Sequence, residues 1–226
     1  MKTVLLSKWT KVILFLLCLG PLARLVWKAF GNGLGANPIE FVTHDTGDWI
    51  LIFLVLTLSI TPARKLLHQP DLIRFRKMLG LFAFFYAFLH FGTWIGLDKF
   101  FDLREMLEDV VKRPFITIGF TGFLLLVPLA VTSTTGWIRR LGGKRWRQLH
   151  RLIYIIAIAG VVHYYWLVKS DIRRPVRYGF LVFALLAYRG LSWLNANRAS
   201  LASFLGQFNI SGKSTSVLFR FGQIRD

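Results

Sequence analysis

The chain has 226 residues, of which 54% are hydrophobic and 15% aromatic, and its formal net charge at pH 7 is +18. This composition is too apolar for an ordinary soluble domain, and several runs reach the ~20 residues that a helix needs to span hydrocarbon. The basic residues stand mostly between the apolar runs, a pattern typical of cytoplasmic loops and of contact with anionic membrane lipid. Because the sequence contains no helix-turn-helix, zinc or RNA-binding motif, the charge does not indicate a nucleic-acid partner.

The apolar runs predict an all-α fold, a polytopic membrane bundle of six transmembrane helices. The first run resembles a signal peptide, but its apolar character continues and no small-x-small cleavage site follows, which favours a span. The spans are predicted at residues 9–30, 48–62, 79–97, 114–131, 149–168 and 176–194. Residues 1–195 would then form the membrane domain, and 196–226 a polar cytoplasmic tail.

Breaker residues set the expected ends of these spans. The glycines and the Asn37-Pro38 pair predict a loop over 31–47. Pro62 is expected to end the second span, and Pro114 stands at the first position of the fourth, where its missing N–H is harmless. A short surface helix is predicted at 102–111.

The distribution of Lys and Arg places both termini in the cytoplasm. The loops 63–78 and 132–147 are strongly basic, as expected for cytoplasmic connections. The basic loop 169–177 would lie outside and therefore violates the charge rule. Either this loop meets an acidic partner or its side chains cap helix ends.

Cysteine chemistry and the common hydrolytic motifs are excluded. Cys18 is the one cysteine, so the chain has no intramolecular disulfide, no Cys-x-x-Cys-His haem attachment and no cysteine-ligated cluster. We expect Cys18 to be a small core residue. No His-Glu-x-x-His, Gly-x-Ser-x-Gly or P-loop occurs. The span interiors lack acids, which argues against a carboxylate-based ion pump.

Two histidines lie inside predicted spans, and ionisable side chains there usually mark a function. His90 follows Lys77 by 13 residues, and His163 follows His150 by the same number. At ~1.5 Å per residue, both histidines lie ~20 Å from the cytoplasmic face. Two imidazoles at one depth on helices that run in the same direction suit axial ligation of one haem iron. The alternatives are interhelical hydrogen bonds or a proton path.

The residues near the two histidines are compatible with a flat macrocycle. Small residues one turn before each histidine would leave room for it, and a tryptophan one turn beyond each would flank it. The same small residues would equally allow close helix packing. The residues concerned are Ala83, Tyr86, Ala87 and Trp94 around His90, and Ala159, Gly160 and Trp166 around His163.

His150 is a less certain cofactor ligand. Thirteen residues turn an ideal helix by ~1300°, which places His150 far from the face of His163. A second haem would want a histidine near position 76 or 77, where Arg76 and Lys77 stand. We therefore predict one firmly bound haem. The roles that remain open for His150 are binding of a second cofactor, ligation of a second haem with another ligand, interaction with an electron donor, and an ordinary interfacial position. His44 and His68 are expected to have no cofactor role.

Several motifs follow one another in order over about residues 9–195. They are LGANPIE (34–40), ITP (60–62), RKMLGL (76–81), LH (89–90), KRPFITIG (112–119), TST (132–134), LGGKRWRQLHRLIY (141–154) and HYYW (163–166). In these motifs the sequence resembles the MsrQ (formerly YedZ) family of the ferric-reductase-like transmembrane superfamily.

The resemblance implies a function and a set of cofactors. It implies a multi-pass haem b subunit of the bacterial inner membrane that is not itself catalytic. Such a subunit passes electrons to MsrP, a periplasmic molybdopterin enzyme that repairs oxidised methionine. The family's functional histidines match His90, His150 and His163, and an FMN is associated with the family. Its electrons are attributed to the quinone pool or to a cytosolic NAD(P)H flavin reductase.

The residues themselves leave two other classes of function open. One is a ferric or other metal reductase on the same haem scaffold. The other is a non-redox transporter or membrane scaffold whose histidines are structural. Four basic residues of the loop 132–147 could hold a flavin phosphate, although cytoplasmic topology explains them equally well. These residues are Arg139, Arg140, Lys144 and Arg145.

Overall fold

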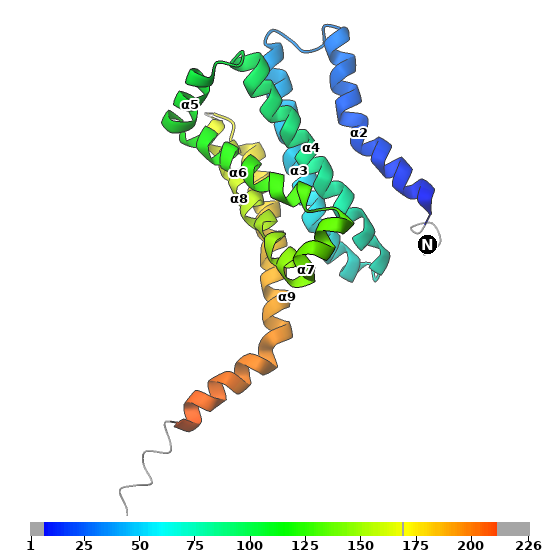
Figure 1. The fold of residues 1–226 in the computed structure, drawn as a ribbon, viewed down its shortest axis with the longest axis vertical. Coiled ribbons are helices and arrows are strands. Elements are labelled where there is room, and N and C mark those ends of the chain that lie inside the picture. The colour runs from blue at the N-terminus through cyan, green and yellow to red at the C-terminus, as the bar shows by residue number, and fades with distance from the viewer. Residues whose placement is uncertain (1–6, 169, 212–226) are drawn as a thin grey trace, which may run out of the picture. The chain divides into compact units, whose positions relative to one another are not determined.

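The computed structural model describes residues 7–168 and 170–211, and every regular element in those ranges is a helix (Figure 1). Within them, five helical segments are long and apolar enough to cross a membrane, and α8 is a shorter apolar helix. The predicted all-α membrane bundle is confirmed, whereas six spans and cytoplasmic termini stay predictions. The elements are α2 (Lys8–Phe30), α3 (Pro38–Leu66), η1 (Pro70–Leu72), α4 (Ile73–Thr93), the π-turn η2 (Trp94–Asp98), α5 (Leu103–Lys112), α6 (Pro114–Val131), α7 (Thr135–Leu149), α8 (Leu152–Leu167) and α9 (Arg173–Ser211).

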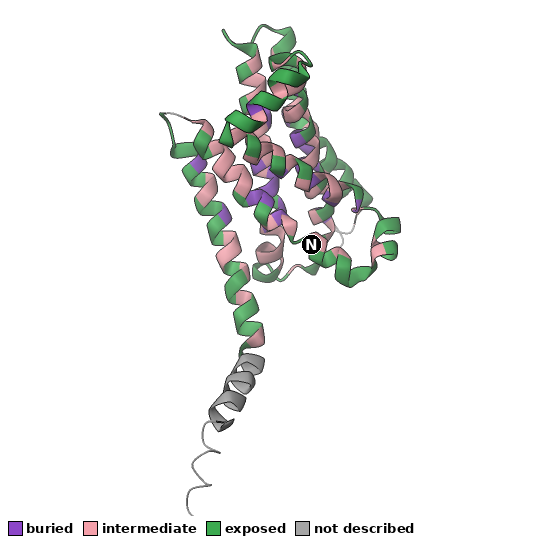
Figure 2. Ribbon diagram, turned by 60° about the vertical axis from the view of Figure 1, so that its left-hand side comes forward, coloured by how far each residue is buried: buried purple, intermediate pink, exposed green. Residues whose placement is uncertain are grey.

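The chain divides into two compact units between Leu185 and Leu186, within α9. In the first unit α3 packs along α4 and α6 along α8, and the contacts α4–α6 and α3–α8 join the two pairs. The buried residues lie on the inward sides of these helices (Figure 2). In the second unit, the side chain of Asn197 donates a hydrogen bond to the carbonyl of Trp193 at 2.8 Å. The predicted domain boundary at residue 195 stays a prediction.

The prediction of a loop up to residue 47 is wrong, because α3 begins at Pro38. Asn37 caps the helix, its side-chain oxygen accepting from the Glu40 N–H at 3.2 Å. Pro38 follows at the first helical position, where its missing donor costs nothing. The same Asn-Pro pair that indicates a break thus marks a helix start. The extra turns bring Thr43, Thr46 and Gly47 into the bundle.

Three further boundaries differ from those predicted. Pro62 does not end α3, which runs on to Leu66, because a proline is tolerated within a membrane helix. The segment 132–147, expected as a loop, is largely helical: α7 begins at Thr135 and runs to Leu149, interrupted at Gly142 by a positive φ of 72°. The last helix continues past 194 to Ser211, and no proline interrupts that stretch. By contrast, α6 begins at Pro114 and the short helix α5 follows Asp102, as predicted.

Tyr86 fastens α2 to α4. Its hydroxyl accepts from the Leu22 N–H at 3.1 Å and donates to the Cys18 carbonyl at 2.9 Å. These two backbone groups are i, i+4 partners, so the hydroxyl inserts into the hydrogen-bond ladder of α2 beside Pro21, an arrangement that bends helices. Cys18 itself is buried, as predicted.

Removing this hydroxyl is expected to destabilise the bundle. The Tyr86→Phe variant leaves the two α2 backbone groups without their buried partner, which should lower the free energy of unfolding by about 1 kcal/mol. The midpoint of denaturation by sodium dodecyl sulfate measures this change. The matched control is Tyr165→Phe, at an exposed position. Equal midpoints for the two variants would show that the Tyr86 hydroxyl does not stabilise the fold.

Candidate functional site: two facing histidines

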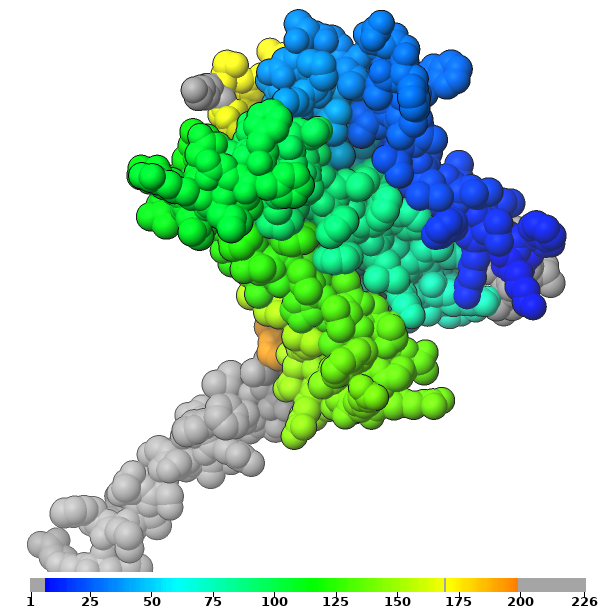
Figure 3. Space-filling model, turned by 45° about the horizontal axis from the view of Figure 1, so that its top comes forward, coloured from blue at the N-terminus to red at the C-terminus, as the bar shows by residue number. Residues whose placement is uncertain are grey.

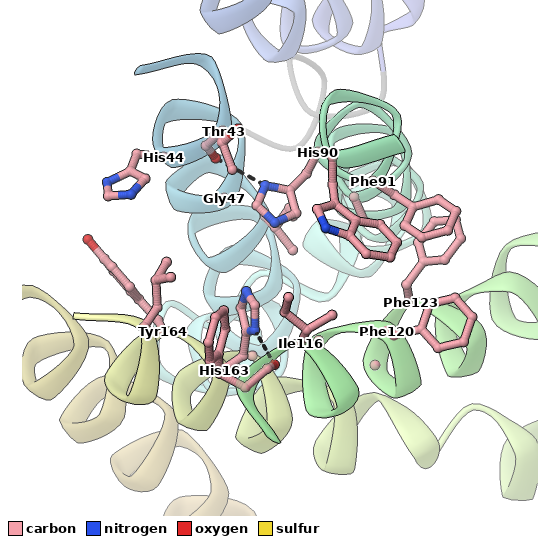
Figure 4. Close-up of a pocket in the computed structure, with 18 of the residues that line it drawn as sticks. Thr43, His44, Gly47, His90, Phe91, Ile116, Phe120, Phe123, His163 and Tyr164 are labelled. Carbon is pink, nitrogen blue, oxygen red and sulfur yellow. Dashed lines mark hydrogen bonds between the residues drawn. The ribbon is translucent and has the colours of Figure 1, made fainter. Parts of the chain in front are cut away.

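His90 on α4 and His163 on α8 point toward one another across the centre of the first unit (Figure 4). Their ring centroids are 6.1 Å apart and the ring planes stand at 88°. They come from the two helix pairs described above, so the pairing of α3 with α4 and of α6 with α8 fixes the separation of the rings. The structure therefore brings together the two histidines that the sequence singled out.

Both histidines are oriented by hydrogen bonds from one ring nitrogen. His90 Nδ1 lies 3.0 Å from the carbonyl of Thr43 and 3.3 Å from the hydroxyl of Thr46. His163 Nδ1 lies 2.7 Å from the carbonyl of Phe115. Because a carbonyl only accepts, each Nδ1 carries the hydrogen and each Nε2 keeps its lone pair. Metal-bound histidines are oriented in this way, with the second nitrogen donating to a fixed acceptor.

The rings border a cavity of about 560 Å³ between α3, α4, α6 and α8. This volume falls in the ~300–1,000 Å³ range of small-molecule and cofactor sites. The wall is mainly apolar and aromatic: Phe91 stacks on Phe123 with ring centroids 4.3 Å apart, and Phe120 lies beside them. His44 and Arg113 also line the cavity. The cavity is thus an apolar pocket with two imidazoles and a few other polar wall residues.

Two glycines make room for the imidazoles. A Cβ on Gly119 would lie 2.7 Å from Nδ1 and 2.8 Å from Cε1 of His163. A Cβ on Gly47 would lie 3.4 Å from Cε1 of His90. The first distance is shorter than real Cβ contacts, so any side chain at position 119 must displace the ring. Gly119 therefore belongs to the site through the space it leaves.

The residues present fit a haem. Two metal–nitrogen bonds of about 2 Å, plus the ring width on each side, put two imidazole centroids roughly 6 Å apart on one metal, which is close to the observed 6.1 Å. Haem iron takes histidine nitrogens as axial ligands. Within residues 7–168 and 170–211 no group of three or more His, Cys, Asp and Glu is arranged to hold a metal ion. The pair therefore suits a macrocycle that supplies the remaining ligands itself.

His150 lies apart from this pair, as its position along the helix predicts, and is not among the residues that line the cavity. Its Nε2 is 3.2 Å from the Thr132 hydroxyl, and its ring lies 4.1 Å from that of Trp146. The indole N–H of Trp146 donates to the Thr132 carbonyl at 2.9 Å. The positive charge of Arg76 acts on His150 electrostatically. Position 76, where a second haem would need a histidine, therefore lies on the His150 side of the bundle.

The other sequence candidates are divided between the cavity and the surface. Ala87, Trp94 and Gly160 line the cavity as expected. Trp166 is 51% exposed, so the prediction that it flanks the site is wrong: its position on α8 points it away from the wall. Ala83 and Tyr86 are buried against neighbouring helices instead. His44 lines the cavity mouth and is exposed, and His68 is exposed in a turn.

The basic loop 169–177 and the basic residues of α7 differ in their surroundings. Arg174 donates to Asp48 at 3.0 Å, which joins the start of α9 to α3 near the cavity. Lys169 of the same loop lies outside the described residues. The four basic residues proposed for a flavin phosphate are all exposed on α7: Arg139, Arg140, Lys144 and Arg145.

The sequence missed the residues that orient the rings. Thr43, Thr46 and Gly47 fell in the segment predicted as a loop. Phe115 and Gly119 lie in the KRPFITIG motif, which supported the family resemblance but gave no sign of contact with His163. A glycine such as Gly119 within an apolar span indicates close helix packing, but the sequence does not show which helix it contacts.

Apolar membrane helices around two inward histidines define a class of membrane protein. Residues 46–161 match the family model described as "Ferric reductase like transmembrane component", so the chain is a multi-pass membrane protein of this ferric-reductase-like class. It is 56% identical over 181 residues to the "Protein-methionine-sulfoxide reductase heme-binding subunit MsrQ" of Herminiimonas arsenicoxydans, covering 79% of this chain and 83% of that protein. Proteins of the same name from Caulobacter vibrioides (strain ATCC 19089 / CIP 103742 / CB 15) and Bordetella pertussis (strain Tohama I / ATCC BAA-589 / NCTC 13251) are 48% and 46% identical, over 84% and 81% of this chain and 90% and 89% of theirs. The chain belongs to the MsrQ family.

Proposed function

We propose that the protein is the haem b electron-transfer subunit of a methionine sulfoxide reductase system in the bacterial inner membrane. It accepts electrons from the quinone pool or from a cytosolic NAD(P)H flavin reductase, and donates them to a periplasmic molybdopterin enzyme like MsrP. The system would repair oxidised periplasmic proteins. The observation that supports this proposal most strongly is the facing pair of His90 and His163, with ring centroids 6.1 Å apart. The names of the relatives support the haem and the methionine sulfoxide reductase system.

Each part of the site has a role in this function. Nε2 of His90 and Nε2 of His163 would hold a haem iron. The haem, when bound, would supply one-electron chemistry. The Thr43 and Phe115 carbonyls keep both rings in the tautomer that leaves Nε2 free. The apolar wall would keep water from the haem, and this burial, together with the two histidines, would set the reduction potential of the haem.

The proposed orientation has six spans and both termini in the cytoplasm. The end of α3 carries Arg64 and Lys65, and α7 at the same side is strongly basic, which fits cytoplasmic connections. The 16 residues of α8 form a helix about 24 Å long at ~1.5 Å per residue, which is less than the ~30 Å thickness of the hydrocarbon. Local thinning of the bilayer accommodates such a short span. The outer ends of α4 and α8 would then carry the histidines close to the periplasmic partner.

We propose that electrons enter on the side of His150. This side chain lies beside Thr132, Trp146 and Arg76, and the exposed basic residues of α7 lie on the adjoining segment. An FMN, whose phosphate is anionic, or the docking surface of a flavin reductase would find positive charge there. The bond chemistry on methionine sulfoxide belongs to the catalytic partner.

The test is a coupled electron-transfer assay in reconstituted vesicles. With the haem reduced, adding the periplasmic reductase and methionine sulfoxide should reoxidise it rapidly, whereas reductase alone should give at most one turnover. Ferric chelates serve as the competing acceptor. Rapid reoxidation by ferric chelates and none by the reductase would support a metal reductase instead.

The entry side has its own prediction. His150→Ala should keep the haem between His90 and His163, because His150 lies outside the cavity, and dithionite should still reduce it. Reduction by quinol or by the flavin reductase should be at least severalfold slower than in the wild type. Unchanged rates with both donors would contradict a role for His150 in electron entry.

A further inference from the structure

The short helix α5 presents three different sides around its circumference. One side carries the buried Asp109 with the half-buried Met106 and Val110, and faces the bundle. A second carries exposed charges, and the third carries exposed apolar residues. At ~100° per residue, residues four apart form a narrow stripe along a helix. The apolar stripe is Leu103, Leu107 and Val111; the charged stripe is Arg104, Glu108 and Lys112.

The apolar stripe is uncovered in this chain. Leu103, Leu107 and Val111 are 71%, 68% and 82% exposed. Two phenylalanines that precede the N-cap Asp102 are exposed as well, Phe100 at 77% and Phe101 at 73%. Figure 3 shows the segment of α5, in green, at the surface of the first unit. Five large exposed apolar side chains in one short segment are more than singly scattered surface residues, and such a concentration marks an interaction site.

The position of α5 in the fold indicates what covers this stripe. It connects the end of η2, at Asp98, to the start of α6, at Pro114. Both flanking segments, Pro70–Asp98 and Pro114–Val131, are long and apolar enough to cross a membrane. The short connection therefore holds α5 at the level where those spans leave the hydrocarbon. An exposed apolar stripe at that level would face the lipid boundary.

Ion pairs fix which way the stripe points. The carboxylate of Asp109 forms ion pairs with Lys99 Nζ at 2.9 Å and with Arg113 Nε at 3.2 Å. Asp109 therefore joins the two connections that flank the helix. Glu108 pairs with Arg104 and Lys112 along the charged stripe. This pairing, and mainly the hydrogen bond from Lys112, lowers the pKa of Glu108. The helix therefore cannot roll its apolar stripe onto the bundle without breaking the pairs of Asp109.

We propose that α5 is an in-plane membrane anchor, with the stripe of Leu103, Leu107 and Val111 and the rings of Phe100 and Phe101 seated in the lipid boundary. A helix that lies in the interface needs an apolar face toward the acyl chains and a charged face toward water, and α5 has both, beside a third face on the bundle. Arg113, which follows α5, and Asp98, at the end of η2 before it, line the histidine cavity. The anchor therefore holds the mouth of that cavity at the membrane surface.

Spin labels read the position of each stripe directly. Cys18, the one native cysteine, is buried, so a Cys18→Ala background allows single labels at exposed sites. Leu103→Cys, Leu107→Cys and Val111→Cys are compared with their next neighbours, Arg104→Cys, Glu108→Cys and Lys112→Cys, in the full chain in phospholipid nanodiscs. Collision rates with oxygen, which concentrates in lipid, and with a water-soluble nickel chelate are measured for each label.

The expected ratio of oxygen to nickel collisions is severalfold higher on the apolar stripe than at each neighbouring position. Equal ratios on the two stripes would overturn the proposal, since the stripe would then face water. Low collision rates with both reagents would overturn it too, because a protein surface, from a second copy or another partner, would cover the stripe. All six substituted side chains are exposed, so no buried contact is lost, and three independent pairs keep the comparison valid if one variant does not fold.

Discussion

Replacing either His90 or His163 by alanine is expected to remove the haem from the cavity. Each ring offers one free Nε2, the other nitrogen being tied to a backbone carbonyl, and the two rings are 6.1 Å apart. A single imidazole leaves the iron with one protein ligand. Since loss of groups that only support a ligand already costs about 10–100-fold in metal affinity, loss of the ligand itself should cost at least roughly 100-fold. Haem content per chain after purification measures the effect.

The matched control for these variants is His44→Ala. His44 also lines the cavity but is exposed at its mouth, and it is expected to keep the haem. Residual haem in either ligand variant should be five-coordinate and high-spin, which the visible spectrum distinguishes from the six-coordinate form. Full haem content with an unchanged low-spin spectrum in His163→Ala would contradict ligation by this residue.

Adding a single methyl group at position 119 is expected to reduce haem binding by about 10–100-fold, as for other groups that orient a metal ligand. In Gly119→Ala the new Cβ would lie 2.7 Å from His163 Nδ1, so the ring must move off the Phe115 carbonyl. Gly119→Val should cost more. The rate at which haem transfers to excess apomyoglobin measures the loss.

Gly92→Ala is the control for this substitution. It lies in α4, two residues from His90, and a Cβ there meets no atom within 4 Å. It should transfer haem at the wild-type rate. If Gly119→Ala also transferred haem at that rate, the ring would have room to adjust, and position 119 would not determine ligand geometry.

The main features of the fold follow from the sequence because hydrocarbon restricts the backbone to helices. The same regularity placed the histidines, since equal residue counts from the basic ends of two helices give equal depths. The boundaries were harder to predict. Asn37 and Pro38 are equally compatible with a loop and with a capped helix start, and packing against α4 decides between them. Pro62 likewise ends a helix in water but not within this bundle.

The facing histidine pair was predictable, but its surroundings were not. His90 and His163 stand out because imidazoles are rare in apolar spans. The carbonyls of Thr43 and Phe115 have no sequence signature, since every residue has a carbonyl group. Gly119 is one glycine among several in the spans, and only the position of α8 against α6 gives it a role. Trp166 was wrongly assigned because sequence spacing on α8 does not say which neighbour each side faces.

The most direct test of haem ligation is a reduced-minus-oxidised visible spectrum of the purified full chain, with pyridine-haemochrome quantification. We expect a b-type haem that is low-spin in both oxidation states and does not bind carbon monoxide when reduced, because His90 and His163 would both ligate the iron. A colourless protein, purified from cells supplied with haem, would contradict it. The facing histidines would then be interhelical contacts and the electron-transfer function would fall with them.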